Sequence, residues 1–179
     1  ETEETPAPEA TESPEPTATP EASVTPAPEN NVLYFKTFEE GTDPADMSDW
    51  SQTWSVDSSA TSKADTGAGN NTTTVWNYYS ATAQNLTAAT TVTASDAGNY
   101  KASFLTAGEN VTGTISLTAG DRKVSADLTA GGWDVYTLAE TDALTVEAGT
   151  KLTITISLDI AAGGYLKIDD ILVTKASDA

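Results

Sequence analysis

The chain has 179 residues, and its 27 acidic and 8 basic residues give a formal net charge of −19. This balance argues against nucleic acid as a ligand, because a phosphate backbone requires a basic surface, and against adsorption to an anionic membrane. No apolar run reaches the ~18 residues that a membrane-spanning helix needs. The absence of Cys and His excludes disulfides, zinc–thiolate sites and Ser-His-Asp catalysis.

The composition changes sharply near residue 30. Residues 1–30 contain seven of the eight prolines, eight Glu and no Lys or Arg, and Val24 is their only large aliphatic residue. This segment cannot bury enough apolar surface to offset its ordering entropy, so we expect a disordered linker that favours polyproline II and spans up to roughly 90 Å. A plain spacer is the first interpretation, and a recognition peptide for an aromatic groove is the alternative. Because the chain starts without Met or a signal peptide, we expect it to come from a longer exported protein.

Residues 31–179 contain all four Trp, all six Tyr and all three Phe, and we expect them to form one domain with its own core. Trp50 follows a loop that contains Pro44 and is expected in that core. Trp54 stands in a polar run, so its burial is not assured, and it is a candidate ligand-binding ring.

The stretch 76–79 combines three aromatic rings with an amide, as Trp76, Asn77, Tyr78 and Tyr79. On a strand, Trp76 and Tyr78 share one face at ~6–7 Å spacing, and Tyr79 occupies the other face. Because sugars stack their C–H faces on indole and phenol rings, these residues are a candidate carbohydrate platform with Asn77 as a polar partner. The alternative interpretation is that the rings belong to the core.

The rest of the domain is typical of successive strands. Gly-containing turns separate segments in which apolar and polar residues alternate, namely 100–104, 114–117, 124–128 and 152–160. The pattern predicts an all-β fold, an antiparallel β-sandwich of the jelly-roll type with eight or nine strands. Trp133 follows two glycines between such segments, and the sequence leaves open whether it rims a loop site or fills the sandwich.

The closing strand changes its apolar phase at a pair of acidic residues. Apolar side chains hold one parity up to Ile168 and the opposite parity from Ile171, with Asp169 and Asp170 at the switch. We therefore expect a β-bulge, which would leave one of these carboxylates poorly placed for solvent.

A calcium ion would resolve that problem, because Ca²⁺ takes carboxylate and carbonyl oxygens in irregular geometry. The first and last strands of a jelly roll are often neighbours, so Glu39 or Glu40 could complete a site with Asp169 and Asp170. Solvated loop acids are the alternative.

Five motifs spread along the domain carry a family resemblance. They are Phe38–Gly41 followed by Trp50, Trp76–Ser80, Ala97–Tyr100, Gly132–Trp133 and Ile168–Ile171. Together they resemble the galactose-binding-like β-sandwich carbohydrate-binding modules, most closely the family 61 galactan-binding modules attached to bacterial endo-β-1,4-galactanases. The resemblance covers nearly all of residues 33–174. It implies a jelly roll, a structural calcium held by the opening Glu and closing Asp residues, and no catalysis.

We therefore expect a monomeric, non-catalytic module of an exported bacterial protein with attached catalytic or surface domains. The candidate polysaccharide-binding residues are Trp54, Trp76, Asn77, Tyr78, Tyr79 and Trp133. β-1,4-Galactan is the preferred ligand, starch, xylan and β-glucan are alternatives, and a cell-surface structural or adhesion spacer without a sugar site is the rival. An enzyme is disfavoured, because adjacent carboxylates such as Asp169 and Asp170 point to opposite faces of a regular strand.

Overall fold

The structure is a computed structural model that describes residues 31–39, 47–55, 60–66 and 74–176. The expected linker at 1–30 lies outside these ranges. The described residues form ten strands: β1 (Val32–Lys36), β2 (Ser51–Trp54), β3 (Ala60–Thr66), β4 (Thr74–Ser80), β5 (Gln84–Thr93), β6 (Gly98–Ala119), β7 (Arg122–Leu128), β8 (Gly132–Glu140), β9 (Leu144–Val146) and β10 (Lys151–Lys175). Within the described ranges, we find no helix with the length and apolarity that a membrane span requires.

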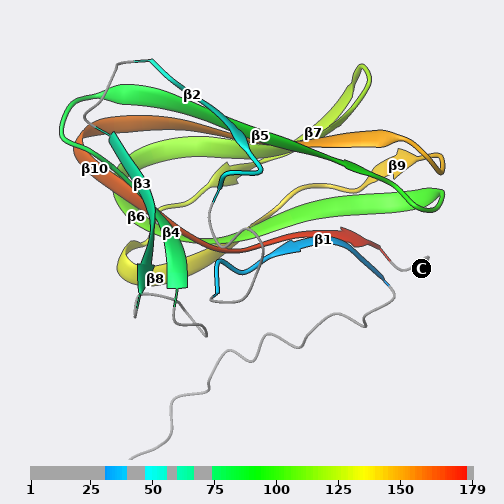
Figure 1. Ribbon diagram of the computed structural model, residues 1–179, viewed down its shortest axis with the longest axis horizontal. Coiled ribbons are helices and arrows are strands. Elements are labelled where there is room, and N and C mark those ends of the chain that lie inside the picture. Colours follow the sequence, from blue (N-terminus) through cyan, green and yellow to red (C-terminus); the bar gives the residue numbers. More distant parts are fainter. Residues whose placement is uncertain (1–30, 40–46, 56–59, 67–73, 177–179) are drawn as a thin grey trace, which may run out of the picture.

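Two long strands, β6 and β10, pair antiparallel along nearly their whole length and bend from one layer into the other (Figure 1). The first layer has the order β2-β5-β10-β6-β7 and uses the first half of β10. In the second layer, the later half of β10 pairs with β4 and β1 on one side and with β6 on the other. β3 extends this layer beyond β4, and β8 and β9 extend it beyond β6.

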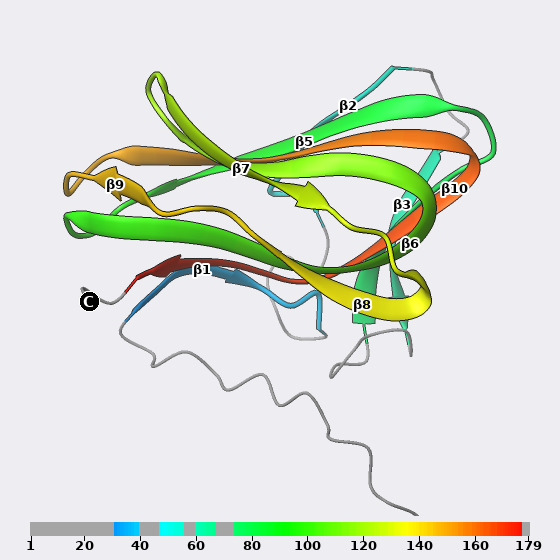
Figure 2. The same ribbon diagram turned by 180° about the vertical axis from the view of Figure 1, so that it is seen from behind.

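The view from behind shows β7 in one layer and β8 in the other (Figure 2). All recorded strand pairs are antiparallel, so the predicted antiparallel β-sandwich is confirmed. The described residues form ten strands, where the sequence predicted eight or nine. The two shortest, β2 and β9, span only four and three residues, which is too short for a recognisable alternation.

The core lies between the two layers and follows the predicted alternation. In the first half of β10, the buried side chains are Leu152, Ile154, Ile156, Leu158 and Ile160. Full burial of an aliphatic side chain of this size contributes about 1.5–3 kcal/mol to folding. The even-numbered positions of this strand therefore fix its register, because a slip of one residue would turn them all to solvent.

The predicted β-bulge is present in β10. Asp169 pairs with Leu105 and Ile171 pairs with Phe104, so Asp170 is an extra residue without a partner in β6. Its φ of 45° lies in the left-handed region, which Asp tolerates better than most residues. The bulge returns Ile171 to the same buried face as Ile168 and explains the phase change in the sequence. β1 pairs with β10 immediately beyond the bulge, so the first and last strands are neighbours, as expected.

Candidate functional site

Three aromatic rings lie on the outer face of the second layer, and we call them the aromatic platform: Tyr79, Tyr165 and Trp133. Tyr79 of β4 pairs directly with Tyr165 of β10, while the next residue pair along these strands, Tyr78 and Leu166, faces the core. Trp133 of β8 meets Tyr165 edge to face, with 5.1 Å between the ring centroids. Trp133 is 62% exposed and Tyr79 is 43% exposed, so both rings offer surface to a ligand.

A departure of β8 from its partner strand carries Trp133 over this face. Thr137 pairs with Thr106 and Gly132 pairs with Gly108, so residues 133–136 lie opposite the single residue Ala107. We call residues 133–136 the arch. Wide insertions of this kind re-aim side chains at the edge of a sheet.

The arch rests on the buried side chain of Lys167 in β10. The Lys167 ammonium lies 3.8 Å from the centroid of the Trp133 ring. It also forms an ion pair with Asp134, the next residue of the arch. Asp134 has a φ of 53°, so this backbone turn is held in a conformation that few side chains favour.

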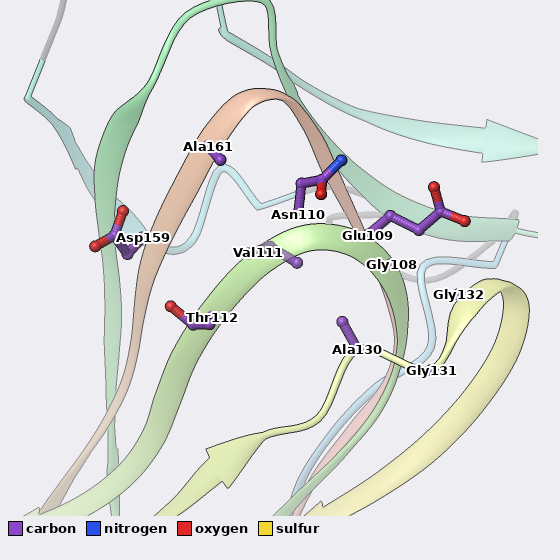
Figure 3. A pocket seen from close by; sticks show the side chains of 10 residues that line it. All are labelled: Gly108, Glu109, Asn110, Val111, Thr112, Ala130, Gly131, Gly132, Asp159 and Ala161. Atoms are coloured by element: carbon purple, nitrogen blue, oxygen red, sulfur yellow. The ribbon is translucent and has the colours of Figure 1, made fainter.

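An open cleft of about 680 Å³ lies where β6 and β10 bend between the layers (Figure 3). Gly132, the residue before Trp133, is part of its lining. Its lining residues are Gly108, Glu109, Asn110, Val111, Thr112, Ala130, Gly131, Gly132, Asp159 and Ala161. Glu109 joins the cleft to the platform, because it pairs with Tyr165. The lining of the cleft therefore offers carboxylate, amide and hydroxyl groups, and the carboxylate of Glu109 lies next to Tyr165.

A close approach of two backbones shapes the bend. A Cβ atom on Gly164 would lie 2.5 Å from the carbonyl oxygen of Asn110 and 2.9 Å from that of Ala161. Such distances leave no room for any side chain, so only glycine fits between the two strands at this corner.

Two carboxylates, those of Glu109 and Asp134, lie close to Tyr165 of the platform. The pKa of Tyr165 is raised, first by burial and then by the negative charges of Glu109 and Asp134. Asp159 is the second carboxylate in the lining of the cleft, and the Lys167 ammonium lies against the Trp133 ring. Carboxylates accept hydrogen bonds, so this arrangement suits a ligand rich in hydroxyl donors and repels anions.

The structure places two expected ligand-binding rings elsewhere. Trp76 and Tyr78 do share one face of β4, but it is the core face, where they are 5% and 0% exposed. Trp76 stacks on Phe38 at 5.9 Å, and Tyr78 contacts Trp54 at 5.8 Å. Both rings therefore belong to the core. Their partners in the neighbouring strand β10 are buried aliphatic residues, and the other layer covers this face of the sheet.

The remaining expected residues are divided between the two faces. Tyr79 and Asn77 lie on the outer face, with Asn77 paired to Lys167. Trp54 is half-buried against the core, and Trp50 is buried in it, as the sequence predicted for Trp50. The sequence left open whether Trp133 borders a loop site or fills the sandwich, and in the structure it lies exposed at the border of the cleft.

Sequence reasoning missed Tyr165, Lys167, Asp134 and Glu109. A signal for the first two was available, since Tyr165 and Lys167 alternate with the apolar Leu166 and Ile168 and must therefore face outward. Asp134 and Glu109 carried no comparable signal, because only the bend of β6 and the arch of β8 bring them to the rings.

The second cluster of interest is the acidic group at the bulge. Asp169 is completely buried. Within the described part of the chain, Oδ1 of Asp170 is buried and accepts no hydrogen bond. The pKa of Asp170 is raised to about 6, first by burial and then by the charges of Asp169 and Glu39.

Glu39 approaches the bulge from the segment that follows β1, and its Oε1 accepts a hydrogen bond of 2.8 Å from the backbone N–H of Thr74. Glu40 lies outside the described residues. Among the side chains that the structure does describe, no three of the His, Cys, Asp or Glu type come together as a metal-binding group. A buried carboxylate oxygen without a donor is nevertheless a fitting ligand for a hard cation.

The sequence matches no protein-family model and no curated protein. Its structure is similar to that of TmCBM61, solved in complex with β-1,4-galactotriose, with a TM-score of 0.66 and 20% identity over 78% of this chain and 99% of that one. It is also similar to the CBM22-1 xylan-binding domain from Paenibacillus barcinonensis Xyn10C, with a TM-score of 0.56 and 12% identity over 83% and 96%.

The enzymatically active domain of tailspike protein 4 from bacteriophage CBA120 is similar as well, with a TM-score of 0.54 and 13% identity. There the match covers 73% of this chain but 20% of the other chain. The fold of this chain is thus that of the β-sandwich carbohydrate-binding modules, which its sequence motifs resemble. Identities this low establish the shared fold, and the site must carry the argument for function.

Proposed function

We propose that this chain is a non-catalytic carbohydrate-binding module and that the aromatic platform and the adjoining cleft bind a neutral polysaccharide. The observation that carries the proposal is the exposed Trp133 ring, fixed beside Tyr165 at the edge of a polar cleft. A pyranose stacks its C–H face on such a ring, and its hydroxyl groups donate hydrogen bonds to carboxylate and amide oxygens. Binding of this kind is modest, roughly micromolar to millimolar.

β-1,4-Galactan is the ligand we favour. The family resemblance in the sequence and the galactotriose complex of TmCBM61 support it. Xylan is the second candidate, supported by the similarity to a xylan-binding domain, and starch and β-glucan remain alternatives. The carboxylates of Glu109, Asp134 and Asp159 favour an uncharged chain over a polyuronate, because like charges repel.

The absence of catalysis is part of the proposal, and the exposure of the cleft acids supports it. Glycoside hydrolysis needs one carboxylic acid that burial keeps protonated near neutral pH. Glu109 and Asp159, the two acids that line the cleft, are both exposed. Asp170, whose carboxyl pKa is raised to about 6, belongs to the bulge and does not line the cleft.

The pairing of the first and last strands suits a module that is attached to other domains. Val32 pairs with Thr174, so the chain enters and leaves the domain side by side. Nine residues separate Thr174 from Tyr165 along β10, which corresponds to roughly 30 Å. An attached catalytic or surface domain of an exported bacterial protein would then be held near the polysaccharide without blocking the site, which raises its effective concentration.

We also propose a structural Ca²⁺ at the bulge, held by Asp169, Asp170 and Glu39, with Glu40 as a further candidate ligand. Two observations support it: among the described residues no group donates a hydrogen bond to the buried Oδ1 of Asp170, and the charges of Asp169 and Glu39 raise the pKa of Asp170. Calcium would neutralise this charge and tie the segment after β1 to β10. Calorimetric titration of metal-stripped protein should show one site for Ca²⁺, and the absence of heat would refute the metal proposal.

Affinity gel electrophoresis tests the sugar proposal. The full chain is run in native gels that contain β-1,4-galactan, xylan, starch or mixed-linkage β-glucan. We expect one neutral polysaccharide to retard the protein and the Trp133→Ala variant to migrate as in an empty gel, with an unchanged melting temperature. The matched control is Trp54→Phe, which alters a half-buried ring outside the platform. If no polysaccharide retards the wild type, the sugar proposal is wrong for these ligands, and the result favours a structural or adhesion spacer.

A further inference from the structure

We infer that Lys167 is a positioning residue that holds Trp133 in its ligand-binding orientation before the ligand arrives. The inference rests on the proposed sugar site, and it assigns a role to a side chain that a ligand would not touch. Lys167 is 2% exposed although it points to the outer face of the sheet, because Trp133 and the arch cover it.

A buried ammonium requires compensation, and the arch supplies it. The indole face of Trp133 lies 3.8 Å from Nζ, and the carboxylate of Asp134 forms the ion pair. Both groups come from consecutive residues of β8. If the arch lifted away, Lys167 would lose its attraction to the ring and its counter-ion in one step.

The arch needs such an anchor, because its four residues lie opposite a single residue of β6. The left-handed backbone at Asp134 is a further cost, of the kind that persists only where surrounding contacts impose it. The contacts of Lys167 with Trp133 and Asp134 therefore hold the arch against the outer face of the sheet. The edge contact with Tyr165 then orients the plane of the indole ring.

The consequence is preorganisation. One face of the Trp133 ring rests on the cation, and 62% of the residue remains exposed for stacking. A ring that is immobilised in advance loses little rotamer entropy when a sugar binds, so more of the stacking energy appears as affinity.

The test uses the full chain with ¹⁵N-labelled tryptophan, whose four indole N–H signals report each ring separately. Lys167→Met keeps an apolar side chain of similar length and removes the charge, whereas Lys167→Arg keeps a cation. Asp134→Asn removes the negative charge that pairs with Lys167. Lys101→Met is the matched control, because Lys101 is in an exposed ion pair with Glu140 at 2.8 Å, away from the arch. The sugar probe is β-1,4-galactotriose, with xylotriose in a parallel series.

We expect Lys167→Met and Asp134→Asn to shift and broaden the Trp133 signal in the free protein, with the other three signals in place. Affinity for the sugar that the wild type binds should fall about 3- to 30-fold, and Lys167→Arg should recover most of the loss. An unchanged Trp133 signal in both variants would overturn the inference. If Lys167→Met fails to fold, the signal in Asp134→Asn decides alone. If the wild type binds neither sugar, the sugar proposal fails for these ligands, and the free-protein signal still decides the role of Lys167.

Discussion

Replacing Asp170 by Asn should stabilise the calcium-free protein at pH 7 and destabilise the calcium-loaded protein. The side chain keeps its shape, and Asn tolerates the left-handed backbone at this position. The pKa of the carboxyl group is raised from 3.8 to about 6 in the folded chain. The folded state therefore holds the proton more tightly than the unfolded state, and the resulting stabilisation is complete below about pH 4 and is lost as the pH rises through 6.

The pKa values set the size of the effect. The difference between 3.8 and about 6 corresponds to at most ~3 kcal/mol, and solvent screening of this partly exposed group reduces it to about 1–2 kcal/mol. For a domain of this size, that is a change in melting temperature of roughly 3–7 °C. Without calcium, the variant should match the wild type near pH 4 and exceed it by this amount at pH 7.

The assay is thermal unfolding followed by circular dichroism between pH 4 and 8, in chelator and in millimolar Ca²⁺. Calcium should raise the melting temperature of the wild type more at pH 7 than at pH 5, because it binds the ionised carboxylate. Loss of that ligand should leave the Asn variant the less stable of the two at pH 7. If the variant gains nothing in chelator, the burial argument is wrong, and if calcium moves neither protein, there is no metal site at the bulge.

Four further outcomes test the packing and the charge of the site. Trp76→Ala should lower the free energy of unfolding by about 3–5 kcal/mol, because it empties a core site, whereas Tyr79→Ala should weaken sugar binding and leave the urea midpoint nearly unchanged. Gly164→Ala should destabilise the corner, since its methyl group would meet the carbonyl of Asn110, and a normal urea midpoint would contradict the close approach described. Polygalacturonan should fail to retard the protein in a gel where a neutral polysaccharide does, at low salt especially, and equal retardation would count against the acidic site.

Much of the fold was predictable because local patterns and tertiary packing agree. The alternation in 152–160 specified a strand and its buried face, and the phase change at Asp169 and Asp170 specified the bulge. No alternating segment was predicted for β1, β3 or β5, or for the short strands β2 and β9, in which three or four residues carry no usable period. These short edge strands are stabilised by their neighbours, which a local pattern does not report.

The candidate site was harder to predict from the sequence. The two-residue period of a strand shows which side chains share a face of the sheet, but it does not show which of the two faces is buried. Trp76 and Tyr78 illustrate this point, since two large rings suit a core face and an open platform equally well. The deciding information lies in the partner strand, where Leu166 points to the core and Tyr165 points outward. Trp133 reaches the platform only through the arch, and the arch follows from the pairing of β8 with β6.

We propose that rings on the outer face, with Trp133 foremost, receive the sugar. The most direct test is to titrate β-1,4-galactotriose, or xylotriose if xylan is the polysaccharide that retards the chain, into the ¹⁵N-labelled protein while the four indole signals are recorded. We predict a saturable shift of the Trp133 signal, with the signals of the buried Trp50 and Trp76 nearly still. Saturable sugar binding without a shift of the Trp133 signal would contradict the proposal that this ring receives the sugar.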